Sequence, residues 1–180
     1  MKKRRATALT LDLHALGRHP GEMLTRRFEA AAPLDLEVGM IGVVPDSPLR
    51  FDLTCQSVGD GVLVQGTVVA QLAGQCARCL RRFERSGDFT LQELYFYPGH
   101  GPRPGEDEEE DALFVEDDAV DLEPVVREAV ACNLPFSPLC RDDCAGLCQA
   151  CGADLNDDPA HAHDAPIDAR WAGLNDLSVG

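Results

Sequence analysis

The segment GVLVQGTVVAQLAGQCARCLRRF, residues 61–83, joins a long strand-like pattern to two closely spaced cysteines. Apolar residues recur with a period near two before the cysteines, which is typical of a β-strand with one buried face. Cys76 and Cys79 follow where one strand ends and the next begins, so a turn should carry both thiols. Two thiolates on one turn can reach the same Zn²⁺ at about 2.3 Å. The segment therefore predicts a strand that leads into half of a metal site.

Strand-like patterns continue on both sides of this segment, from residue 33 to residue 97. Residues 58–61 (VGDG) separate two apolar runs and predict a hairpin, and residues 86–88 (SGD) give a weaker turn signal. Residues 7–13 also alternate like a strand, whereas residues 16–24 (LGRHPGEML) read as a turn into a short helix. Hairpin-linked strands without long intervening helices predict an antiparallel sheet or a small, partly open β-barrel.

A helix is expected after the strands, at residues 121–134 (DLEPVVREAVACNL), with Asp121 as its cap and Pro135 just beyond its end. It should cover the sheet with one apolar face, formed by Leu122, Val125, Val126, Ala129 and Val130. A second, short helix is expected at residues 164–177 (DAPIDARWAGLNDL).

The chain is thus predicted to be an α+β protein with three parts. Residues 1–97 form a β-rich domain, and residues 98–118 form an acidic flexible linker whose Gly/Pro stretch and EDEEED run cannot bury apolar area. Residues 119–180 contain the covering helix and a cysteine-rich, zinc-binding C-terminal segment that packs back on the β-rich domain.

Zinc in a structural site takes four ligands, and the chain offers eight candidates. The preferred division places four cysteines on one ion and two cysteines with two histidines on another. A rival division puts the four cysteines of residues 140–151 on one ion, which is cramped and leaves the first pair without partners. The preferred sets are Cys76, Cys79, Cys140 and Cys144, and Cys148, Cys151, His161 and His163.

Three other roles for the cysteines compete with structural zinc. A disulfide framework requires export, and the N-terminal residues 1–13 contain no apolar run of signal-peptide length. A redox dithiol at Cys76 and Cys79 would be favoured by the neighbouring Arg78, which can lower a thiolate pKa, but a redox CxxC usually opens a helix beside a βαβ pattern and Cys76 follows a strand-like run. A zinc hydrolase would need an open metal position, but HExxH and HxE with PCxxC are both absent from the sequence. We therefore expect no enzyme. The lone cysteines, Cys55 and Cys132, are expected to be buried hydrophobes outside the metal sets.

Charge is divided unevenly along the chain. The net charge is -15, yet residues 1–100 carry 12 Lys and Arg against 11 Asp and Glu, and the remaining residues carry 4 against 20. Such a balance argues against binding nucleic acid by bulk attraction, which rests on clustered basic residues. A local basic patch remains the predicted partner-binding surface: Arg78, Arg81, Arg82 and Arg85. With no run of 18 apolar residues, a membrane span is not expected and the chain is predicted to be cytoplasmic.

Two cysteine motifs carry a resemblance to a known family. CxRCLxxF at residues 76–83 and LCxxxCxGLCxxCGxxLN at residues 139–156 resemble the YceD family of bacteria and chloroplasts, the large ribosomal RNA subunit accumulation proteins. The family's six cysteines fall on those of the two motifs, whereas many members have CxC where this chain has His161-Ala162-His163.

The resemblance implies a non-enzymatic factor needed for 23S rRNA accumulation or processing and for large-subunit assembly. Its expected partner is precursor large-subunit rRNA or a ribosomal protein, with zinc as cofactor and no small-molecule substrate.

Overall fold

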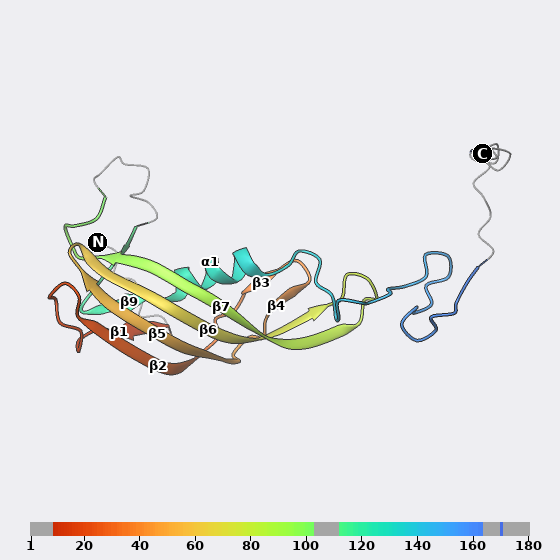
Figure 1. Cartoon of the computed structure of the whole chain (residues 1–180), viewed down its shortest axis with the longest axis horizontal. Helices are drawn as coiled ribbons and strands as arrows, with labels where there is room; N and C mark the ends of the chain where they lie inside the picture. Colours follow the sequence, from red (N-terminus) through yellow and green to blue (C-terminus); the bar gives the residue numbers. More distant parts are fainter. Residues whose placement is uncertain (1–8, 103–111, 164–169, 171–180) are drawn as a thin grey trace, which may run out of the picture.

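The computed structural model describes residues 9–102, 112–163 and 170. These residues form a seven-stranded sheet, a separate two-stranded sheet and one α-helix (Figure 1). The strands are β1 (Thr10–Asp12), β2 (Met23–Ala31), β3 (Glu37–Val38), β4 (Ile41–Val43), β5 (Pro48–Val58), β6 (Gly61–Gln75), β7 (Arg82–Phe96), β8 (Leu113–Phe114) and β9 (Ala119–Asp121), and the helix is α1 (Glu123–Asn133).

β6 is the centre of the larger sheet. It pairs along its whole length with β7 on one side, and on the other side it pairs first with β5 and then with β4. β2 continues the sheet beyond β5, and β3 continues it beyond β4. Every pairing is antiparallel except that of β7 with β8. The predicted antiparallel sheet is confirmed, and the described strands do not close into a barrel.

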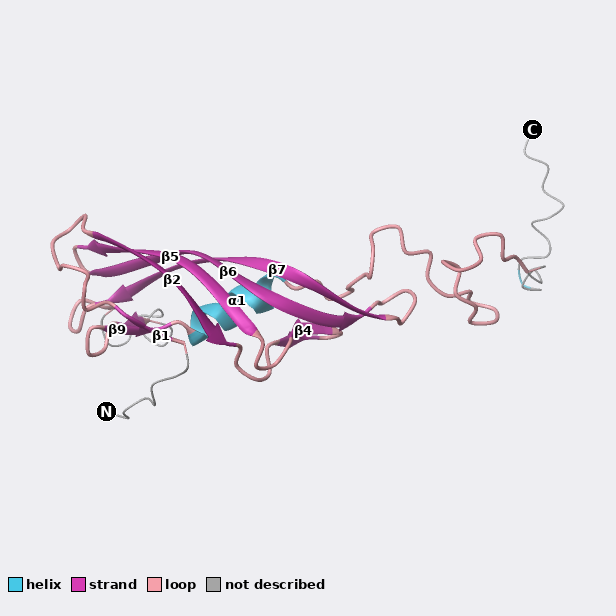
Figure 2. Cartoon of the chain, turned by 90° about the horizontal axis from the view of Figure 1, so that it is seen from below, coloured by secondary structure: helices cyan, strands magenta, loops and turns pink. Residues whose placement is uncertain are grey.

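One face of the sheet supplies the core. Alternate residues of the central strands point inward and are almost fully buried, such as Leu53 of β5, Val68 of β6 and Leu91 of β7. α1 lies across this face (Figure 2) and buries Val126 and Val130 against it. Burial of each such side chain contributes about 1.5–3 kcal/mol, so the helix is held by its apolar stripe. The predicted covering helix is confirmed.

The start of α1 differs by one residue from the expectation. Its N-cap is Leu122, and Pro124 occupies the first turn, where a missing N–H costs nothing. Asp121 precedes the cap, but its carboxylate still accepts a hydrogen bond of 3.0 Å from the backbone N–H of Glu123. At the other end Leu134 is extended, as expected for a residue before proline.

The short helix expected at residues 16–24 is wrong. Turns lead instead into β2, which begins at Met23 and pairs with β5 from Met23↔Gln56 to Ala31↔Pro48. Within β2, exposed residues alternate with half-buried ones such as Leu24 and Phe28. Pro20 and Gly21 do form the expected turn, but pairing of this half-apolar strand with β5 gives a strand after it and not a helix.

Of the two turn signals, one is confirmed and one is wrong. β5 ends at Val58 and β6 begins at Gly61, as the hairpin signal predicts. Residues 86–88, however, run straight through β7. A Cβ on Gly87 would lie 2.6 Å from Cδ1 of the buried Leu72, so the absence of a side chain at Gly87 leaves room for the side chain of Leu72. The small residue serves packing there, not chain reversal.

Part of the expected linker belongs to the fold. β8 lies within it and pairs with residues 95–96 at the end of β7, and Val115 is buried. The predicted strand at residues 7–13 is confirmed as β1, which pairs with β9. Residues 103–111 of the linker lie outside the described residues. So does the expected C-terminal helix at residues 164–177, apart from Arg170.

Candidate metal centre

The turn between β6 and β7 presents Cys76 and Cys79 together. The N–H of Leu80 donates to the carbonyl of Cys76 at 2.9 Å, and the N–H of Cys76 donates to the carbonyl of Arg81 at 2.9 Å. Leu80 adopts a left-handed conformation with φ of 61°, which turns the chain sharply after the second cysteine. Both thiols consequently lie on the same side of the turn, and both are buried.

The segment after α1 brings a second pair of thiols to this turn. The N–H of Ala77 donates to the carbonyl of Pro138 at 2.8 Å, and Arg78 Nη1 donates to the carbonyl of Cys144 at 2.9 Å. Half-buried Leu139 and Leu147 pack around the thiols. Cys140 and Cys144 thereby meet cysteines that lie more than sixty residues earlier in the chain.

The four sulfur atoms have the spacing of a tetrahedral zinc site. Sγ of Cys76 lies 3.7 Å from Sγ of Cys144, and Sγ of Cys79 lies 3.7 Å from Sγ of Cys140. A regular tetrahedron with sulfur about 2.3 Å from zinc has edges of about 3.8 Å. A disulfide would require about 2.05 Å. The four thiols therefore fit a metal ion and are not disulfide-bonded.

The surroundings of these thiols oppose ionisation of the whole set without a cation. Burial tends to raise the pKa of Cys76, but backbone N–H groups of Cys79, Cys140 and Arg78 lower it to about 6. Burial and the neighbouring thiols raise the pKa of Cys140 to about 12. A bound divalent cation stabilises thiolates directly and would offset both burial and mutual repulsion.

Cys148, Cys151, His161 and His163 form a second group near the end of the described chain. The N–H of Cys148 donates to the carbonyl of Ala153 at 2.7 Å. The ligands of this group are more open to solvent than those of the first group, since Cys151 and His163 are exposed and Cys148 and His161 are half-buried. Backbone N–H groups of Cys151 and Ala150 lower the pKa of Cys148 to about 6.

The second group is drawn together more closely than a regular site requires. Nε2 of His161 lies 3.2 Å from Sγ of Cys151, and Nε2 of His163 lies 3.1 Å from the same sulfur. The two Nε2 atoms are 2.9 Å apart. Zinc with about 2.3 Å to sulfur and about 2.0–2.1 Å to nitrogen gives edges of about 3.4–3.6 Å. The donor types suit zinc, and the four-cysteine group matches its geometry better.

The structure thus gathers the eight candidate ligands in the division preferred from the sequence. Ligand atoms within each group lie within 4.8 Å of one another. The rival set, with residues 140–151 on one ion, is not formed.

Two further residues support the clusters and were missed as site residues. The side-chain amide of Asn156 lies 3.6 Å from Sγ of Cys144, and its oxygen accepts a hydrogen bond of 2.9 Å from the N–H of Ala145. The carboxylate of Asp154 forms an ion pair with Arg81, with 2.8 Å between Oδ2 and Nε. Asn156 is the last residue of the second cysteine motif, so its place in that motif was the available signal.

The four arginines of the predicted partner-binding patch have different roles. Arg78 and Arg81 are engaged within the chain, the first with Cys144 and the second with Asp154 and Asp157. Arg82 and Arg85 are exposed, and the guanidinium carbon of Arg85 lies 5.6 Å from the centre of the Phe83 ring. All four are exposed and stay predicted partner-binding residues, and Arg78 and Arg81 also hold the cysteine segments together.

The two lone cysteines lie outside both groups. Cys55 is fully buried in the core, where burial raises its pKa to about 11. Cys132 is exposed on α1, so the expectation that it is buried was wrong. The apolar stripe of the helix faces the sheet, and Cys132 lies outside that stripe.

Comparison with known proteins identifies the family of the chain. The model of the family described as "Large ribosomal RNA subunit accumulation protein YceD" matches residues 64–178, which include both cysteine groups. The chain belongs to the YceD family. Uncharacterized proteins of Mycobacterium bovis and Mycobacterium tuberculosis are each 40% identical over 172 residues, covering 96% of this chain and 82% of theirs. An uncharacterized protein of Mycobacterium leprae is 38% identical, covering 94% of this chain and 77% of its own.

No solved structure matches the chain significantly. Within the described residues, no helix has the length and apolar character needed to cross a bilayer.

Proposed function

We propose that this YceD-family chain is a non-enzymatic ribosome-biogenesis factor of the cytoplasm. It supports accumulation and processing of 23S rRNA and assembly of the large ribosomal subunit. Membership of the family supports this role. The observation that carries its structural part is the four-cysteine cluster, which joins the β6–β7 turn to the segment after α1.

Zinc is proposed to act as a structural ion that crosslinks distant parts of the chain. Cys76, Cys79, Cys140 and Cys144 would hold one ion, and the second group of two cysteines and two histidines would hold another. The ion supplies a crosslink between distant parts of the chain, and binding of structural zinc is largely folding free energy. Four protein ligands on each ion leave no position for substrate, which supports a non-catalytic role.

Precursor large-subunit rRNA or a ribosomal protein is the proposed partner. The strong negative charge disfavours bulk attraction to phosphate, so RNA binding would depend on a local surface containing Arg82 and Arg85. Crosslinking in cells, followed by identification of captured RNA or protein, decides between the two partners.

Deletion of the gene tests the proposal. We expect a lower ratio of 23S to 16S rRNA and fewer mature large subunits on a sucrose gradient. A plasmid copy should restore both, a Cys79→Ser copy should not, and a Cys132→Ser copy should do so as a control, because Cys132 lies outside both clusters. Normal 23S rRNA and normal subunits in the deletion strain would reject the proposed function.

A thiol redox protein is the second candidate, favoured by the low pKa of Cys76. Attack on a disulfide requires an accessible thiolate, yet Cys76 is 0% exposed and Cys79 is 5% exposed. Stoichiometric zinc, with these thiols unreactive until a chelator is added, would eliminate the redox function. Thiols that exchange with glutathione in metal-free, folded protein would support it.

A further inference from the structure

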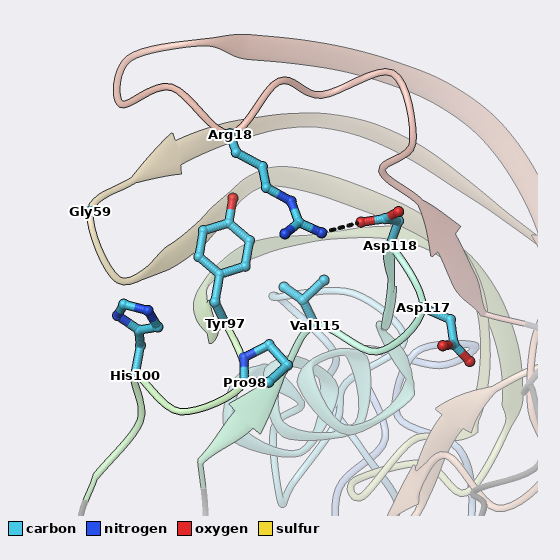
Figure 3. Close-up of a pocket in the computed structure, with 8 residues that line it drawn as sticks. All are labelled: Arg18, Gly59, Tyr97, Pro98, His100, Val115, Asp117 and Asp118. Carbon is cyan, nitrogen blue, oxygen red and sulfur yellow. Dashed lines mark hydrogen bonds and ion pairs between the residues drawn. The ribbon is translucent and has the colours of Figure 1, made fainter.

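A hollow of about 660 Å³ opens at the end of the sheet farthest from the four-cysteine cluster. Gly59, in the β5–β6 hairpin, and Tyr97, just after β7, both line it, and Figure 3 shows the Tyr97 ring in the middle of the lining residues. The four-cysteine cluster begins at the opposite end of β6. At about 3.3 Å per residue, the fifteen residues of β6 separate the two places by about 45–50 Å.

An aromatic ring forms the centre of the hollow. The hydroxyl of Tyr97 lies 3.3 Å from that of fully buried Ser57, which fixes the direction of the ring. His100 approaches Tyr97 edge-on, with ring centres 6.5 Å apart. The guanidinium carbon of Arg18 lies 5.7 Å from the centre of the Tyr97 ring. The ring already attracts a cation from its own chain.

Acidic residues lie in and beside the lining of the hollow. Asp118 accepts a bond of 2.9 Å from Arg18 Nη2, as Figure 3 shows, and Asp60 lies 3.4 Å from Nδ1 of His100. Asp117 lines the same hollow, although its carboxylate points away from Tyr97. The lining holds two carboxylates, those of Asp117 and Asp118, against the one guanidinium of Arg18, so its formal charge is negative and it favours a cation over phosphate.

The side chain of Arg18 is held only weakly in its position over the Tyr97 ring. It belongs to the loop between β1 and β2 and reaches over Tyr97 from there (Figure 3). Its side chain is 75% exposed, and that of Asp118 is 50% exposed. Exposed ion pairs of this kind contribute little to stability, so an outside group of the same chemistry can replace this one at small cost.

On the basis of the function proposed above, we propose that this hollow binds an arginine side chain of a basic polypeptide partner. The incoming guanidinium takes the place of Arg18 over Tyr97 and pairs with Asp118. Arginine suits the site better than lysine, because its planar group stacks on an aromatic face and bonds a carboxylate through two N–H groups. A nucleic acid would bring its phosphates beside the carboxylates of Asp117 and Asp118 and is disfavoured.

The test uses the full-length protein and a fluorescent peptide in which arginine alternates with glycine over seven residues. We expect Arg18→Ala to raise the affinity for this peptide about threefold to tenfold, because the internal competitor is removed. Tyr97→Leu should lower the affinity by a similar factor. A merely structural role for Arg18 would give no gain.

Arg27→Ala is a matched control for the charge change. Arg27 pairs with Asp52 at 2.9 Å, and the two side chains are 77% and 51% exposed, nearly the same values as in the Arg18–Asp118 pair. Both substitutions add the same negative charge, so nonspecific attraction of a basic peptide affects them equally. The predicted gain belongs to Arg18→Ala alone.

Equal affinities of the Arg18→Ala and Arg27→Ala proteins would overturn the assignment. So would peptide binding that does not change in Tyr97→Leu protein of normal thermal stability. Tighter, Tyr97-dependent binding of a uridine oligonucleotide would assign the hollow to RNA instead. None of these outcomes bears on the rRNA phenotype of the deletion strain, which tests the proposed function separately.

Discussion

Arg78 donates a hydrogen bond of 2.9 Å from Nη1 to the backbone carbonyl oxygen of Cys144. The two residues belong to the two halves of the four-cysteine cluster. Gly146 lies close by, and a Cβ there would approach the Arg78 carbonyl within 3.2 Å. The arginine of the first cysteine motif therefore fastens the second motif in place.

Replacement of Arg78 by alanine should loosen this attachment. Loss of a hydrogen bond from a charged donor costs about 1–2 kcal/mol, which corresponds to about tenfold faster metal release to a chelator. Release can be followed with a zinc-sensitive dye. Arg82→Ala is the control, since Arg82 is exposed. Equal release rates for the two variants would contradict a structural role for Arg78.

Cys79→Ser and Cys148→Ser should have unequal effects. Cys79 shares its cluster with cysteines that follow α1, so its loss should release that whole segment from the sheet and lower thermal stability strongly. Loss of Cys148 should loosen mainly the segment around the second group, because that group is formed within residues 148–163. Hydrogen exchange of α1 and β7 distinguishes the two cases. Matching exchange profiles in the two variants would argue against two separate sites.

Leu80 should accept asparagine but not valine. Its φ of 61° is left-handed, a conformation that asparagine tolerates and that β-branched residues avoid. The side chain is 50% exposed, so little packing is lost by either change. We expect Leu80→Val to cost about 2 kcal/mol and Leu80→Asn less than about 1 kcal/mol. Denaturant unfolding of zinc-loaded protein measures both, and a Leu80→Asn protein less stable than the Leu80→Val protein would refute the expectation.

Gly66 in the middle of β6 should not tolerate alanine. A Cβ there would lie 2.1 Å from the carbonyl oxygen of Asp52 in the neighbouring strand, and φ is 152°. We expect Gly66→Ala to destabilise the protein by roughly 3 kcal/mol, which lowers Tm by about 6–12 °C. Gly59→Ala is the control, because a Cβ there would meet nothing within 4 Å. Thermal unfolding followed by circular dichroism should show little change in the control.

The sequence was most informative where a local pattern determines a local structure. The VGDG turn and the apolar stripe of α1 follow from rules that act over a few residues. The ligand division followed from spacing, since four ligands within residues 140–151 leave little room to face one another. These expectations needed no knowledge of distant contacts.

Other features depend on contacts between distant residues. Nothing near Gly87 reveals that Leu72 of the neighbouring strand fills the space above it. Arg81 looked like a free charge because its partners, Asp154 and Asp157, follow more than seventy residues later. β2 owes its form to pairing with β5, which a turn signal cannot disclose. Long-range packing decided each of these cases.

β6 and β7 pair residue for residue from Gly61↔Phe96 to Gln75↔Arg82, without interruption. The length of this two-stranded ribbon fixes the distance between the four-cysteine cluster at one end and the hollow at the other. A partner that contacts both ends must present its contacting groups at that distance. Deleting two residues from each strand, opposite one another, would shorten the span by about 7 Å and keep every side chain on its own face. Deleting one residue from each strand would move the buried side chains beyond the deletion to the solvent face of the sheet. Any natural change of span in this ribbon should therefore come in steps of two.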